Sequence, residues 1–87
     1  MPAEAGLLSH TSVSLRLASV PLRTPCTIVG VDGPRSVRRR LLELGLVPGT
    51  RVAVIGVSPL GDPLELEVRG SRVSVRKKEA LGIEVRA

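Results

Sequence analysis

The chain has 87 residues, enough for one small domain with a modest core, and its 13 basic and 8 acidic residues give a net charge of +5. It contains no Phe, Tyr or Trp, so it lacks the aromatic platforms on which single-stranded nucleic acids and proline-rich peptides dock. Its single cysteine, Cys26, cannot form an intrachain disulfide, and we interpret it as a small strand residue rather than a reactive thiol. The N-terminus does not resemble a secretory signal and no apolar run could span a bilayer, so we expect a cytoplasmic protein.

The first part of the chain predicts a tail followed by a short strand. Residues 1–14 are small and polar without sustained periodicity, so we expect a flexible tail before a folded domain of residues 15–87. Pro21 and Pro25 interrupt the next segment, which predicts edge or loop structure. Residues 26–31 predict a strand, because they are rich in β-branched side chains and end at a turn-forming Asp-Gly-Pro.

A short helix is predicted over residues 36–45, with Ser36 as its N-cap. The residues expected to face the core share one stripe at helical spacing: Val37, Leu41 and Leu44. Gly45 is placed to take the left-handed position that ends a helix, and residues 47–50 predict a type II turn. The three arginines of residues 38–40 would then crowd the first turns, where the helix dipole favours acidic side chains. A helix that starts near Pro34 would move them off the first turn and relax this conflict.

The second half of the chain predicts short strands with tight turns. An apolar strand over residues 51–57 is followed by a rigid loop with two prolines over residues 58–63. A hairpin follows, in which Gly70 and Ser71 form a two-residue loop of the II′ kind. That loop predicts four facing pairs: Arg69 with Arg72, Val68 with Val73, Leu66 with Val75, and Glu65 with Arg76.

A helical turn over residues 77–82 and a closing strand over residues 83–86 complete the domain. Several short strands, tight turns and one small helix indicate a mainly β fold, a small and strongly bent barrel.

Several segments together resemble the FeoA family: RRRLLELGLVPGT, PLGDPLELEVRG, a short strand that ends in RKKEA, and a terminal IEV. The resemblance covers about residues 17–86 and implies an SH3-like β-barrel with one short inserted helix. It also implies association with FeoB, a membrane GTPase transporter of bacterial ferrous iron uptake. The chain departs from the family at Arg23, where the family often has Gly, and at Ser71, where an aromatic residue is common.

The sequence contains no group of residues suited to metal binding or catalysis. A metal site needs three or four converging ligands, and this chain has one histidine, in the tail, and one cysteine. The folded part has no histidine that could activate Cys26 or a serine as a nucleophile, and no phosphate-binding loop. We therefore expect no metal site, no cofactor and no enzymatic activity, so that any link to iron runs through a partner.

Four residues are candidates for contacting a partner: Arg38, Arg39, Leu42 and Leu60. The arginines form either a solvated helix face, with Arg39 paired to Glu43, or the cationic rim of a docking patch anchored by Leu42. Leu60 either folds back over the barrel end or is an exposed contact held rigid by its flanking prolines.

Our leading hypothesis is an accessory protein that binds and modulates a FeoB-type transporter and reaches the membrane only through that partner. One alternative is a basic barrel associated with nucleic acid, which the missing aromatics and the interspersed acids Glu65, Glu67 and Glu84 disfavour, so we expect no nucleic acid partner. The other alternative is a self-associating module, and a homo-oligomer stays open.

Overall fold

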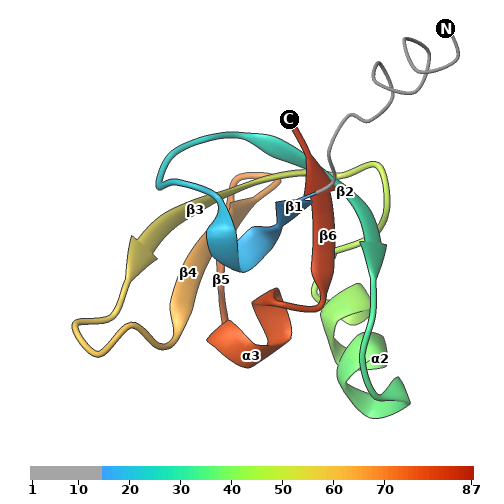
Figure 1. The fold of residues 1–87 in the computed structure, drawn as a ribbon. Helices are drawn as coiled ribbons and strands as arrows, with labels where there is room; N and C mark the ends of the chain where they lie inside the picture. The colour runs from blue at the N-terminus through green and yellow to red at the C-terminus, as the bar shows by residue number, and fades with distance from the viewer. Residues whose placement is uncertain (1–14) are drawn as a thin grey trace, which may run out of the picture.

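The computed structural model describes residues 15–87 (Figure 1); the tail predicted for residues 1–14 lies outside the described residues. Six strands form one antiparallel sheet in the order β1-β6-β2-β3-β4-β5. Their bounds are β1 Leu15–Arg16, β2 Cys26–Val31, β3 Arg51–Val57, β4 Leu64–Val68, β5 Ser71–Val75 and β6 Ile83–Arg86. The helical elements are η1 Leu17–Ser19, α2 Arg35–Glu43 and α3 Lys77–Ala80. The prediction of a mainly β fold with one short inserted helix is confirmed.

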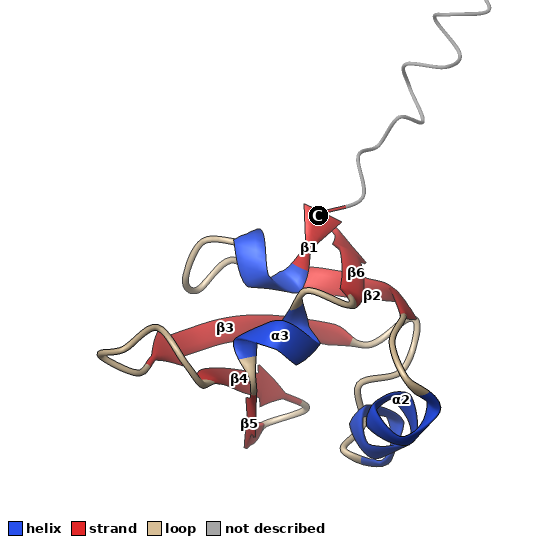
Figure 2. Cartoon of the chain, turned by 60° about the horizontal axis from the view of Figure 1, so that its bottom comes forward, coloured by secondary structure: helices blue, strands red, loops and turns tan. Residues whose placement is uncertain are grey.

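The sheet bends around a core of aliphatic side chains, and α2 projects from it between β2 and β3 (Figures 1 and 2). The order of the strands leaves β1 and β5 at the two edges, so the barrel is not closed by strand pairing between them. The side chains with 0 or 1% exposure and the largest volumes come from most elements of the fold: Leu17, Ile28, Leu41, Leu46, Leu66, Ile83, Val75 and Val85. Since the chain lacks aromatic residues, branched aliphatics fill most of the interior, together with Cys26 and Ala80.

The hairpin between β4 and β5 turns one residue earlier than the sequence predicted. Arg69 and Gly70 have φ values of 52° and 81°, so they are the two turn residues, in the I′ rather than the II′ form. Val68 therefore faces Ser71, and Leu66 faces Val73. The predicted register was wrong by two residues, which leaves every side chain on its predicted face because strands repeat every two residues.

The new register also changes the charge pairs of the hairpin. Glu65 faces Ser74 and forms an ion pair with Arg72 at 3.7 Å, not with Arg76 as predicted. Arg76 instead lies 3.9 Å from Asp62 in the loop before β4. That loop is thereby linked to the start of α3.

The N-terminus of α2 lies earlier than predicted. Pro34 occupies the N-cap position, and its carbonyl accepts the first helical hydrogen bond from the Arg38 N–H at 2.9 Å. Ser36 lies inside the first turn and forms no side-chain cap, so its assignment as N-cap was wrong. The fixed φ of proline, here −58°, pre-sets the chain for entry into the helix and explains the earlier start. Arg40 then falls in the last turn, where the dipole favours a positive charge.

The C-terminus of α2 ends as predicted, at Gly45 with φ of 96°. The Leu46 N–H donates to the Leu41 carbonyl at 3.1 Å and the Gly45 N–H donates to the Leu42 carbonyl at 3.0 Å, which together form a Schellman motif. Leu44 is 37% exposed, so the prediction that it faces the core was wrong. The reversal at Gly45 buries Leu46 in its place.

Candidate partner-binding site

The outer face of α2 carries a stripe of three arginines and one leucine, which we call the α2 stripe: Arg35, Arg38, Arg39 and Leu42. These positions are spaced i, i+3, i+4 and i+7, so they lie on one side of the helix. Together they line a shallow surface hollow of about 370 Å³. The structure thus brings three of the four predicted contact residues together and adds Arg35, which the sequence interpretation missed because it began the helix at Ser36.

The positive charge of the α2 stripe is largely uncompensated. Arg39 lies 3.8 Å from Glu43, and both side chains are more than 70% exposed, so this i, i+4 pair is weak. Within residues 15–87, neither Arg35 nor Arg38 forms an ion pair. Leu42 is 39% exposed at the C-terminal end of the stripe. The surface therefore combines free guanidinium groups with one aliphatic contact.

Arg40 points to the opposite side of the helix and holds α2 in place. Its guanidinium forms a hydrogen-bonded ion pair with the carboxylate of Glu79 in α3. The other carboxylate oxygen of Glu79 accepts the Arg76 N–H at 2.9 Å. The hydrogen bond from Arg40 lowers the pKa of Glu79 below its ordinary value, and the bond from Arg76 adds to the effect. The sequence interpretation gave Arg40 no such role, because its partner is 39 residues away.

The fourth predicted contact residue, Leu60, lies apart from the α2 stripe. Its side chain is 92% exposed, so the alternative in which it folds back over the barrel end is wrong. Figures 1 and 2 both place the loop between β3 and β4 at one end of the domain and α2 at the other. Leu60 and the α2 stripe are therefore two separate surfaces.

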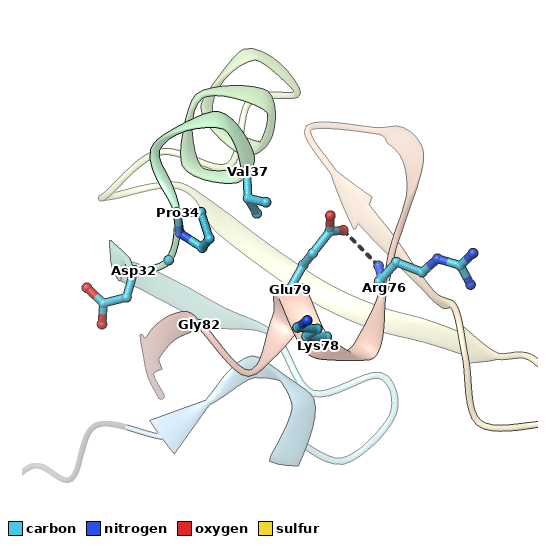
Figure 3. Close-up of a pocket in the computed structure, with 8 residues that line it drawn as sticks. Asp32, Pro34, Val37, Arg76, Lys78, Glu79 and Gly82 are labelled. Atoms are coloured by element: carbon cyan, nitrogen blue, oxygen red, sulfur yellow. Dashed lines mark hydrogen bonds between the residues drawn. The ribbon is translucent and has the colours of Figure 1, made fainter.

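A second hollow, of about 420 Å³, lies between α2 and α3 (Figure 3). Pro34 and Val37 form its α2 side, and Glu79 and Lys78 its α3 side. The ion pair between Arg40 and Glu79 spans the same two helices, so the hollow is part of the junction that fixes the orientation of α2. Its residues are dispersed in the sequence, and no local pattern indicated it.

The described residues show no arrangement for metal or thiol chemistry. Within residues 15–87, no group of three or more His, Cys, Asp or Glu side chains gathers where it could hold a metal ion. The Cys26 thiol is buried and lies 3.5 Å from the Val52 carbonyl, and burial raises its pKa. The interpretation of Cys26 as a small strand residue is confirmed. In the same range, no helix has the length and apolar character needed to cross a membrane.

Comparison with known proteins identifies relatives for almost the whole described domain. A family profile described as the FeoA domain matches residues 15–87. A fusion of Fe(2+) transport protein A with the Fe(2+) transporter FeoB, from Porphyromonas gingivalis, is 35% identical over 71 residues, which are 82% of this chain. The matched segment spans 8% of the length of that relative.

Solved structures agree with this assignment. The FeoA protein of Chlorobium tepidum is 36% identical, with a TM-score of 0.78 over 83% of this chain and 69% of its own. The zinc complex of Stenotrophomonas maltophilia FeoA, described as a prokaryotic SH3 domain protein, is 32% identical, with a TM-score of 0.71 over 82% of this chain and 88% of its own. The expected SH3-like fold is thereby confirmed, and the chain belongs to the FeoA family.

Proposed function

We propose that this chain is a non-catalytic accessory domain that docks on the cytosolic part of a FeoB-type ferrous iron transporter through the α2 stripe. The fusion relative supports the choice of partner, because it carries the two proteins in one polypeptide. Covalent linkage keeps two domains at high effective concentration, and natural fusions of this kind suit domains that act together. The present proposal places the contact between the two on a binding surface of this domain.

The observation that carries the proposal is the uncompensated charge of the α2 stripe beside an exposed leucine. Arg35 and Arg38 have no ion pair within the described range, and Leu42 provides aliphatic area beside them. Interface centres are enriched in arginine and apolar side chains, which matches this arrangement. The partner surface is expected to be acidic, since complementary charge both steers association and fixes orientation.

A titration with the isolated cytosolic domain of the transporter tests the proposal. Arg38→Glu reverses one free charge of the α2 stripe, and we expect binding to weaken by about tenfold or more, mostly in the association rate at low salt. Arg86→Glu, an exposed position at the end of β6, is the control with the same change in charge. We expect it to bind like the unchanged chain.

A second variant tests the contribution of Leu42 to binding separately from that of the positive charge. Leu42→Ser leaves the charge unaltered and removes the aliphatic contact, and we expect a faster dissociation rate. If Arg38→Glu and Leu42→Ser both bind normally, the α2 stripe is not the docking surface. If Arg86→Glu weakens binding as much as Arg38→Glu does, net charge alone carries the association.

A further inference from the structure

The loop between β3 and β4 presents an apolar tip to solvent. Leu60 is 92% exposed, the highest exposure among the large hydrophobic side chains of residues 15–87. Pro59 beside it is also exposed, and Val57 at the end of β3 is 44% exposed. Within the loop, residues 58–63, the only acidic side chain is Asp62. We call residues 57–63 the apolar tip.

The apolar tip is held in one shape by its own hydrogen bonds. The Gly61 N–H donates to the Ser58 carbonyl at 2.7 Å, and the Ser58 N–H donates to the Pro63 carbonyl at 3.1 Å. These bonds close a tight turn with Leu60 near its apex. A preformed turn loses little conformational freedom when its side chain is buried elsewhere, so more of the burial energy of the leucine is available for binding.

The carboxylates in and next to the apolar tip are already paired. Asp62 accepts the Lys77 N–H at 3.0 Å and lies 3.9 Å from the Arg76 guanidinium. Glu65, the next acid along the chain, is paired with Arg72. The tip therefore offers little free negative charge to a partner surface.

The same contact brings the start of α3, which carries two lysines, to the loop. The bond from the backbone N–H of Lys77 to the Asp62 carboxylate joins the first turn of α3 to the loop. Both Lys77 and Lys78 are exposed, and neither side chain forms an ion pair within residues 15–87. An aliphatic side chain at a loop apex, on a loop bonded to a helical turn with two unpaired lysines, has the chemistry that an anionic bilayer surface recognises.

We propose that the apolar tip and the first turn of α3 contact an anionic lipid surface, with Leu60 entering the interfacial layer and the side chains of Lys77 and Lys78 lying on the headgroups. This site is distinct from the α2 stripe and does not depend on it. One leucine and two lysines give only weak, reversible binding, since stable anchoring takes stronger signals. The lipid contact therefore orients the domain at the membrane rather than recruiting it there, and in this one respect the inference rests on the proposed function. Figure 1 shows the loop, α3 and α2 along the lower side of the domain, with the loop and α2 at its two ends.

A tryptophan placed at the tip reports on this contact directly. The chain has no tryptophan, so Leu60→Trp creates a single indole at a position whose exposure makes a folding defect unexpected. Leu22→Trp is the matched control, because Leu22 is a 52% exposed leucine in the proline-flanked segment between η1 and β2. With vesicles of phosphatidylcholine and phosphatidylglycerol at 3:1, we expect a blue shift of the emission for Leu60→Trp only. Vesicles of phosphatidylcholine alone are expected to give no shift.

The lysines are tested in the Leu60→Trp background. Changing both Lys77 and Lys78 to Gln should weaken vesicle binding by about fivefold for each charge removed. The proposal is wrong if the Leu60→Trp emission does not move, if Leu22→Trp shifts to the same extent, or if the lysine variant binds the anionic vesicles unchanged. None of these results bears on the α2 stripe, which is measured with the soluble partner domain.

Discussion

Arg40 in α2 and Glu79 in α3 form an ion pair that ties the inserted helix to the rest of the domain. The side chain of Glu79 is 14% exposed, whereas that of Arg40 is 47% exposed, so the carboxylate is the more deeply placed partner. Because the α2 stripe lies on the other side of the same helix, this pair also sets the direction in which the stripe faces. The orientation of the α2 stripe therefore depends on an ion pair whose residues lie outside the stripe.

Glu79→Gln should destabilise the domain in a pH-dependent manner. The folded-state pKa of Glu79 is lowered from 4.5, so the ionised pair stabilises the fold above that pH, and the stabilisation is lost as the pH falls through the folded-state pKa. At pH 7 we expect the free energy of unfolding to fall by about 1–2 kcal/mol in Glu79→Gln. The difference from the unchanged chain should shrink as urea unfolding is repeated at pH values below 4.5.

Glu43→Gln is the control for that measurement. Glu43 forms its ion pair with Arg39 on the exposed surface of α2, and such pairs contribute about 0.5 kcal/mol or less. If Glu79→Gln and Glu43→Gln have equally small effects at pH 7, the contact between α2 and α3 does not stabilise the fold.

Gly82→Ala should be strongly destabilising for a steric reason. The Asp32 N–H donates to the Gly82 carbonyl at 2.7 Å, and a Cβ at Gly82 would lie 2.5 Å from the Asp32 carbonyl oxygen. The backbone between β2 and β6 would have to move, which typically costs about 1–3 kcal/mol. Gly56→Ala is the matched control, because its Cβ would meet Glu65 at an ordinary 3.7 Å. Equal melting temperatures for the two variants would contradict the close approach at Gly82.

Leu41→Ala and Leu42→Ala should separate the inner and outer faces of α2. Leu41 is 0% exposed, so its truncation is expected to lower the free energy of unfolding by about 3 kcal/mol. Leu42 is 39% exposed, so its truncation should change stability by about 0.5 kcal/mol or less. Urea unfolding of both variants checks the ranking, and a large loss in Leu42→Ala would mean that the α2 stripe is partly core.

Features that depend on neighbouring residues were easier to predict from the sequence than contacts between residues far apart in the chain. The end of α2 was predictable because Gly45 and the following turn are local backbone preferences written in consecutive residues. The start was not, because both Pro34 and Ser36 are acceptable at a helix N-terminus, and the local pattern does not choose between the fixed φ of the proline and the side-chain cap of the serine. The pair between Arg40 and Glu79 was missed since it joins distant segments, whereas the α2 stripe was largely found because helical spacing is local.

The hairpin register shows a different limit of sequence interpretation. Hydrophobic alternation defines which face each residue occupies, but a shift by two residues preserves that pattern. The choice between turns at Arg69-Gly70 and at Gly70-Ser71 then depends on backbone conformation at one position. An arginine with positive φ is uncommon, which is why the pattern favoured the wrong turn.

Arg69→Asn should stabilise the domain if the turn has the I′ form. Arg69 has φ of 52°, a conformation that costs most L-residues about 1–2 kcal/mol and that asparagine adopts more readily. Asn-Gly is also the preferred pair for a two-residue hairpin of this type. We expect the free energy of unfolding to rise by about 1 kcal/mol in urea titrations. Ser71→Asn is the control, because Ser71 lies in β5 opposite Val68 and gains nothing from an asparagine there. A gain for Ser71→Asn without one for Arg69→Asn would restore the register in which Gly70 and Ser71 form the turn.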